Sequence, residues 1–163
     1  MTPKDFTTTI LVNQTPIEVF NAVNNVRGWW SENINGGTEK QNDVFDYNFK
    51  NAHTAKIKLE EVVPNKRVVW HMLKNYFKFT KDTSELTDSR VIFDIATKGD
   101  QTQLTFTHQG LLPACECYSV CEEAWTHYVQ ESLHDLITEG KGEPNPKEGG
   151  FNAELTEKWE AQQ

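Results

Sequence analysis

The sequence contains no long hydrophobic run. No stretch of its 163 residues approaches the roughly 18 apolar residues that a membrane-spanning helix needs. The start, Met1–Asp5, is polar and is not followed by the apolar segment of a signal peptide. We therefore expect a cytoplasmic protein with no membrane insertion.

Cysteine is scarce as well, with only Cys115, Cys117 and Cys121. An odd number of cysteines without a secretion signal favours free thiols over a disulfide framework. Together with His127 the three could suggest zinc, but they lack the paired, well-separated knuckles of structural zinc sites. We predict unpaired, metal-free thiols and no cofactor.

Basic residues are outnumbered. The chain has 16 Lys and Arg against 24 Asp and Glu, a formal net charge of -8. Nucleic acids and anionic membranes are bound through basic patches, so this balance argues against both as partners. The nucleophile elbow, phosphate-binding loop, dinucleotide fingerprint and zinc-protease motif are also missing. We assign no catalytic residue.

What is present fits a globular chain, with 37% hydrophobic and 11% aromatic residues. The length suits one domain. We expect a single domain over residues 1–142 and a polar tail over residues 143–163 that could form a short helix.

The first elements follow from residue types and spacing. Residues 6–12 are β-rich and predict a strand. Thr15, Pro16 and Glu18 form a capping box with proline at the first helical position, and apolar residues then recur along one face. Gly28 is expected to end this helix. A short helix or loop follows at residues 29–32.

A period of two then predicts strands near residues 45–49, 55–59, 68–72, 90–97 and 104–108. Short connections between them favour an antiparallel sheet. Residues 75–89 are polar and are interpreted as a long loop, in which a short strand could be hidden.

The last regular element is a helix over residues 118–139, ended by Gly140 and Gly142. Its apolar stripe is broad enough to lie in the palm of a curved sheet. The stripe runs through Cys121, Ala124, Trp125, Tyr128, Ser132 and Leu136, widened by Val129 and Leu133. The fold expected is α+β: a curved antiparallel sheet wrapped around a long C-terminal helix, with two short helices after the first strand.

Four strings carry a family resemblance: Thr15–Phe20, Val62–Trp70, Gln101–His108 and the helix Trp125–Gly142. In this order they resemble the START-like superfamily, also called SRPBCC, and within it the branch named for the activator of the heat-shock protein ninety ATPase. The resemblance covers roughly residues 5–142.

The resemblance implies the helix-grip fold, with an apolar cavity between sheet and helix that holds hydrophobic molecules. A few branches of the superfamily are enzymes. The eukaryotic co-chaperone of this branch carries an additional N-terminal domain that stimulates the chaperone. Only five residues precede Phe6, so we expect that domain to be absent.

The aromatic residues are the candidate ligand site. They could form a solid core or the walls of a pocket for a small apolar molecule, and Trp29 with Trp30 is expected to gate its mouth. The candidate ligand-binding residues are Trp29, Trp30, Phe45, Tyr47, Trp70, Phe106, His108, Trp125 and Tyr128.

Two rival functions remain. Strand parity places His108 on the face of Leu104 and Phe106, so it could point inward. His108 or a neighbouring tyrosine could then act in an enzyme for a small hydrophobic substrate. The other rival is a module that docks onto a protein partner such as a chaperone. The ligand and the oligomeric state do not follow from the sequence.

Overall fold

The computed structural model describes residues 4–78 and 80–146, together with Leu155 and Glu157. Its elements in chain order are β1 (Phe6–Val12), α1 (Pro16–Asn24), α2 (Val26–Trp29), β2 (Ile34–Gly36), β3 (Val44–Phe49), β4 (His53–Val63), β5 (Arg67–Phe77), β6 (Arg90–Lys98), β7 (Gln101–Gln109), α3 (Tyr118–Thr126), the π-helix η1 (His127–Leu133) and α4 (His134–Glu139).

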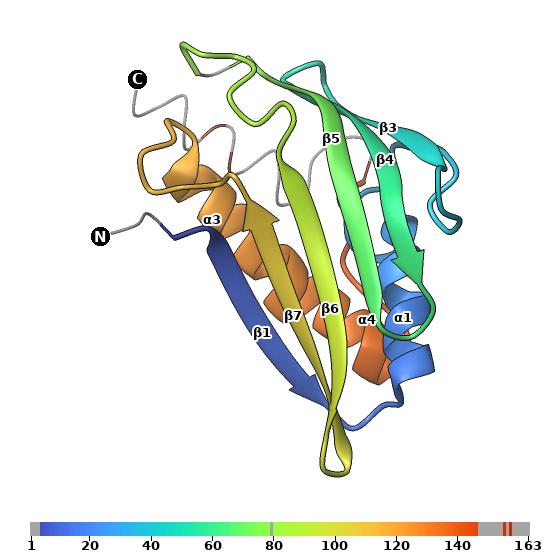
Figure 1. Ribbon diagram of the computed structural model, residues 1–163. Helices are drawn as coiled ribbons and strands as arrows, with labels where there is room; N and C mark the ends of the chain where they lie inside the picture. Colours follow the sequence, from blue (N-terminus) through green and yellow to red (C-terminus); the bar gives the residue numbers. More distant parts are fainter. Residues whose placement is uncertain (1–3, 79, 147–154, 156, 158–163) are drawn as a thin grey trace.

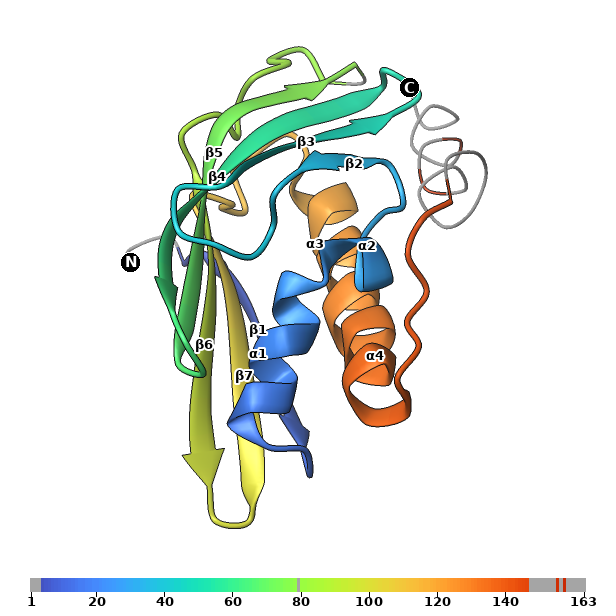
Figure 2. The same ribbon diagram turned by 90° about the vertical axis from the view of Figure 1, so that its right-hand side faces the viewer.

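The described strands form one antiparallel sheet in the order β1-β7-β6-β5-β4-β3-β2 (Figure 1). The described helices lie on one face of this sheet, and β3–β5 curve over the start of α3 (Figure 2). This is the α+β helix-grip fold expected from the sequence, with two short helices after the first strand, and that prediction is confirmed. No helix in the described ranges is long and apolar enough to cross a membrane.

The predicted capping box at the start of α1 is confirmed. The Glu18 N–H donates to Oγ1 of Thr15 at 3.3 Å, and the Thr15 N–H donates to Oε2 of Glu18 at 3.0 Å. The prediction that Gly28 ends this helix is wrong. α1 ends at Asn24, and Gly28 lies inside α2. A Cβ on Gly28 would lie 2.6 Å from Nδ2 of Asn25, so the glycine serves close packing there.

The long C-terminal helix appears where it was predicted, as α3, η1 and α4 in unbroken succession from Tyr118 to Glu139. Gly140, with φ +79°, ends it in the left-handed conformation. The π segment was not foreseen. Each π turn holds more residues than an α turn, so the buried stripe moves on by one position and runs through Val129, Leu133 and Ile137. Leu136, placed on the predicted stripe, is only partly buried.

β5 is longer than predicted and takes in the first residues of the supposed loop. Lys74 and Tyr76 are exposed, whereas Asn75 and Phe77 are buried, so the apparent polarity reflects one face of a strand. The chain that follows pairs with the same strand. The Phe77 N–H donates to the Thr83 carbonyl at 2.9 Å, and the Asp88 N–H donates to the Met72 carbonyl at 2.8 Å.

The three-residue strand β2 was missed because it is too short to show a period. It pairs with β3, and Gly36 in it has φ +117°, a conformation that favours glycine. Residues 143–146 continue along α2, where Asn145 is buried and donates from Nδ2 to the Trp30 carbonyl at 3.1 Å. Most of the tail for which a short helix was suggested lies outside the described residues.

Candidate functional site

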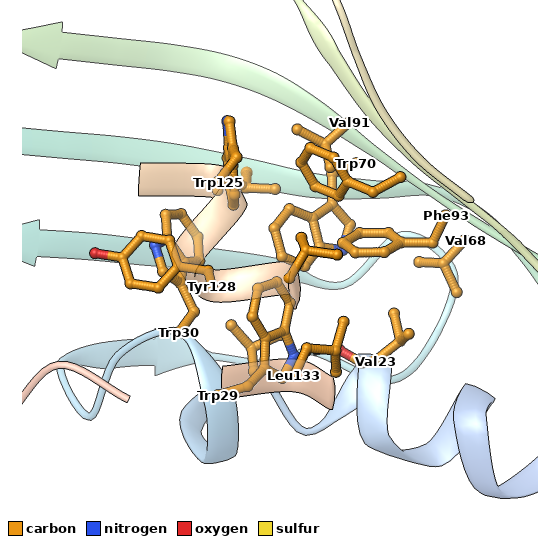
Figure 3. Close-up of a cluster of buried hydrophobic side chains, with 14 of the residues drawn as sticks. Val23, Trp29, Trp30, Val68, Trp70, Val91, Phe93, Trp125, Tyr128 and Leu133 are labelled. Atoms are coloured by element: carbon orange, nitrogen blue, oxygen red, sulfur yellow. Dashed lines mark hydrogen bonds between the residues drawn. The ribbon is translucent and has the colours of Figure 1, made fainter. Parts of the chain in front are cut away.

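The nine candidate residues meet in one aromatic cluster, of which Figure 3 labels Trp29, Trp30, Trp70, Trp125 and Tyr128. Ring centroids are 4.4 Å apart for Trp30 and Tyr47, 5.5 Å for Trp30 and Trp125, and 4.8 Å for Phe106 and Trp125. Trp70 lies 6.0 Å from Trp29 and 5.4 Å from Phe45. The cluster is completed by His108 and Tyr128, both in contact with Trp125. Six different elements therefore supply one continuous set of rings: α2, β3, β5, β7, α3 and η1.

The expectation that Trp29 and Trp30 gate a cavity mouth is wrong. They are 0% and 2% exposed. Trp29 donates from Nε1 to the Val23 carbonyl at 3.1 Å and packs against Phe93. Trp29 is the last residue of α2 and Trp30 follows it, with the Trp30 carbonyl accepting from the backbone N–H of Asn145 at 2.9 Å. Both residues are thus core side chains.

A cavity of about 50 Å³ lies beside this cluster, between β3–β5 and the start of the last helix. Five of the nine candidates line it (Trp30, Tyr47, His108, Trp125 and Tyr128), whereas Trp29, Phe45, Trp70 and Phe106 pack behind them. The lining residues that the sequence did not single out as site residues are His53, Met72, Asn75, Phe77, Leu86, Val120, Cys121, Ala124 and Leu155.

The size of this cavity matters for its use. A dry cavity that binds benzene measures about 150 Å³, and about 30 Å³ is one water's share of the liquid. About 50 Å³ therefore holds no more than one or two waters. The interior is nearly filled, and an organic occupant would require a side chain to move.

His108 is fixed by hydrogen bonds on both ring nitrogens. Nε1 of Trp125 can only donate, so Nδ1 of His108 accepts, at 3.0 Å. Nε2 must then carry the proton of a neutral ring, and it donates to Oγ of Ser89 at 2.8 Å, which donates to the Leu86 carbonyl at 2.6 Å. Burial, with a smaller contribution from His53, lowers the pKa of His108 to about 3. With both nitrogens engaged, His108 has no lone pair to offer a substrate, which argues against the acid–base role suggested for this residue.

A second polar pair, His53 and Asn75, faces the cavity. Nε2 of His53 lies 3.1 Å from Oδ1 of Asn75. Burial lowers the pKa of His53 to about 4, although the hydrogen bond to Asn75 opposes this. Nδ2 of Asn75 is buried and has no partner among the described residues. A buried donor without a partner costs about 1–3 kcal/mol.

A β-bulge explains why Asn75 points inward. Lys56 pairs with Lys74 and Ile57 pairs with Met72, so Leu73 is an extra residue on β5. The bulge shifts the inward parity from Trp70 and Met72 to Asn75 and Phe77. No pattern in the sequence predicted this bulge. His53, by contrast, continues the inward alternation of Ala55, Ile57 and Leu59, and that signal was available.

The described part of the cavity lining carries no Lys, Arg, Asp or Glu. Burial raises the pKa of Tyr47 and of Tyr128, so both phenols are protonated at neutral pH. The Tyr128 hydroxyl accepts from Nδ2 of Asn145 at 2.6 Å. With neutral histidines and protonated tyrosines, the cavity is uncharged.

Two carboxylates fix the cavity's outer wall by tying the loop after β5 to the start of α3. Glu85 accepts from the backbone N–H of Glu116 at 3.0 Å and of Cys117 at 2.8 Å. In the opposite direction, the Glu116 carboxylate accepts from the backbone N–H of Lys81, in the loop, at 2.7 Å. Glu85 thereby caps the last helix and holds its neighbour Leu86 against the cavity.

The three cysteines carry free thiols, with Cys117 and Cys121 buried and Cys115 partly exposed. The contact with Cys121, together with burial, raises the pKa of Cys117, so this thiol stays protonated. Within the described residues, no three His, Cys, Asp or Glu side chains are grouped so that they could hold a metal ion.

Comparison with solved structures gives the same fold. A dimeric Aha1 from Colwellia psychrerythraea superposes with a TM-score of 0.68 at 22% identity, over 85% of this chain and 99% of that one. PFC0360w, an HSP90 activator from Plasmodium falciparum, gives 0.52 at 21% identity, over 81% and 92%. CalU16 from Micromonospora echinospora gives 0.56 at 14% identity, over 95% and 83%.

No protein of curated function matches the chain significantly. The profile of one family, described as activator of Hsp90 ATPase homolog 1-like protein, matches residues 15–138, which includes α1, the strands β2–β7 and nearly all of the last helix. The chain therefore belongs to the activator of Hsp90 ATPase homolog 1-like family.

Proposed function

We propose that the protein binds a small apolar molecule in the cavity between β3–β5 and α3. The observation that carries the proposal is a hollow in a closely packed aromatic core, next to a buried amide N–H with no partner among the described residues. Small-molecule sites are typically concave and apolar, with a few polar groups that fix orientation. Trp30, Trp125 and Tyr128 would form the apolar wall.

Entry of such a molecule requires space. Leu155 is the one described lining residue that follows the last helix, and it is 6% exposed. Its side chain lines the same cavity as Trp125 and Tyr128. We propose that Leu155 leaves this position when the ligand enters.

The test is a titration with naphthalene, followed by tryptophan fluorescence. Saturable binding is expected, and Leu155→Ala should tighten it by about tenfold, since the volume is then free without displacement. Leu11→Ala is the control, because Leu11 is 47% exposed on β1 and is not among the lining residues. Absence of saturable binding in both the natural protein and a folded Leu155→Ala variant would refute the proposal.

Two observations favour a second function, a module that docks onto a chaperone. The interior is nearly filled, and one structural neighbour is described as an HSP90 activator. This function is tested by measuring the ATPase rate of an Hsp90 chaperone with and without the protein. Stimulation, together with no naphthalene binding, would make docking the leading function.

A further inference from the structure

The side-chain amide of Asn75 is a prepared hydrogen-bond donor. Asn75 is 3% exposed and lines the cavity. Its Oδ1 is taken by Nε2 of His53 at 3.1 Å, whereas its Nδ2 has no partner among the described residues. Because protein interiors rarely leave a donor unpaired, an occupant of the cavity is the natural source of the missing acceptor.

The backbone around this amide is held in place, so its direction is set before any ligand arrives. The Asn75 N–H donates to Oγ1 of Thr87 at 3.1 Å, and the same hydroxyl donates to the Asn75 carbonyl at 3.3 Å. The Leu73 bulge turns the side chain inward. His53, neutral with its proton on Nε2, engages the amide oxygen and leaves the amide nitrogen for the cavity.

The chemistry of the other lining groups restricts the acceptor. No described lining residue carries a formal charge, and both nitrogens of His108 are already bonded. A carboxylate entering this space would find no cation to pair with, and burying an unpaired charge is prohibitively costly. A carbonyl oxygen, in contrast, needs one donor and no charge.

From these groups we infer that the cavity selects an uncharged aryl ketone or a compound of that class, whose carbonyl oxygen accepts from Nδ2 of Asn75 and whose ring packs against Trp30 and Trp125. This inference rests on the proposed function and deepens it, since it names the polar group that distinguishes one apolar molecule from another.

Three probes of matched size test it: acetophenone, α-methylstyrene, in which a CH₂ replaces the ketone oxygen, and benzoate. Affinities are measured for Leu155→Ala and for Leu155→Ala combined with Asn75→Leu. The ratio of ketone to alkene affinity should fall by about tenfold, equal to about 1.4 kcal/mol, when Asn75 is replaced. Taking the ratio cancels the different hydration of the two probes.

The second readout needs no change at Asn75. In a nitrogen-15 spectrum of the natural protein, acetophenone should shift the Asn75 side-chain amide resonances far more than α-methylstyrene does. Thr87→Val is a further variant, because it removes both hydrogen bonds to the Asn75 backbone but keeps the amide; it should lower the ratio of ketone to alkene affinity by less than Asn75→Leu does.

The outcomes separate this inference from the proposal beneath it. If neither neutral probe binds saturably, the proposed function fails. If both bind and the affinity ratio is the same with and without Asn75, the proposed function stands and the role of Asn75 is refuted. Benzoate binding as tightly as acetophenone would refute the selection for uncharged molecules.

Discussion

The indole N–H of Trp125 donates to Nδ1 of His108 across 3.0 Å, joining the last helix to the last strand inside the core. The other ring nitrogen is hydrogen-bonded to Ser89, so His108 links three parts of the chain and has a structural role. The bond to Trp125 also fixes the protonation state of the ring, since a second proton on His108 would break this bond.

The free energy of unfolding should therefore decrease as the pH is lowered from about 6.5 toward about 3. The pKa of His108 is about 3 in the folded protein, against about 6.5 for an unfolded histidine. Between these values the unfolded chain binds a proton that the folded chain does not, so the free energy of unfolding decreases as pH falls. The stabilising contribution is complete above about pH 6.5. His53, with a pKa of about 4, acts in the same direction.

The measurement is urea unfolding between about pH 7 and about pH 5, above the range where most carboxylates titrate. Each histidine contributes a slope approaching 1.4 kcal/mol per pH unit. His108→Gln should remove one of the two slopes. Ser89→Ala, which lowers stability but keeps the histidine, should retain both. Equal slopes for His108→Gln and the natural protein would contradict this account.

Trp29 tests the packing of the aromatic cluster. Trp29→Ala should lower the free energy of unfolding by about 3–5 kcal/mol, because a fully buried indole leaves a large cavity. Ile17→Ala, at a residue 54% exposed, should change it by less than about 0.5 kcal/mol. Denaturant unfolding measures both. A loss below 1 kcal/mol at Trp29 would show that the cluster is not packed as described.

Glu85 tests the connection between the loop and α3. Removing its carboxylate leaves the N–H groups of Glu116 and Cys117 without their acceptor. Glu85→Ala should cost about 0.5–2 kcal/mol, the range for a lost helix cap. Glu139→Ala is the matched control: it removes a carboxylate from the opposite end of the helix, where negative charge opposes the dipole, and should be neutral or slightly stabilising.

The thiols can be counted by reaction with Ellman's reagent. In the native protein only Cys115 should react promptly, because Cys117 and Cys121 are buried and Cys117 is held protonated. In denaturant all three should react. Rapid reaction of two thiols in the native protein would contradict the burial of Cys117 and Cys121. Reaction of fewer than three thiols in denaturant would show a modification or a bond that the structure lacks.

Much of the fold followed from the sequence because the elements carry strong local signals. The capping box at Thr15 and the alternation through Phe45, Tyr47 and Phe49 identified α1 and β3. Interior positions on the strands were found where such an alternation ran undisturbed, and Trp125 and Tyr128 were found from the apolar stripe of the last helix.

Other features of the site could not be predicted, because no local pattern in the sequence marks them. Leu73 reverses the parity of β5 and brings Asn75 into the cavity. Leu155 joins the lining from a part of the chain with no periodic signal. Cavity size likewise depends on how side chains from distant elements meet, and no local pattern encodes it.

The π-helix η1 has a consequence for how the C-terminal helix tolerates change. An α-helix advances about 100° per residue, so one added residue resets the angular phase of everything beyond it. Cys121 and Trp125 in the first half of the helix face the cavity, and Leu133 and Ile137 in the second half pack into the hydrophobic core. The change of angular phase that η1 introduces allows both halves to face inward. Deleting one residue from His127–Leu133 would rotate one half of the helix by about 100°, so that its buried side chains would no longer face the sheet. In this segment residue count is constrained more tightly than residue identity.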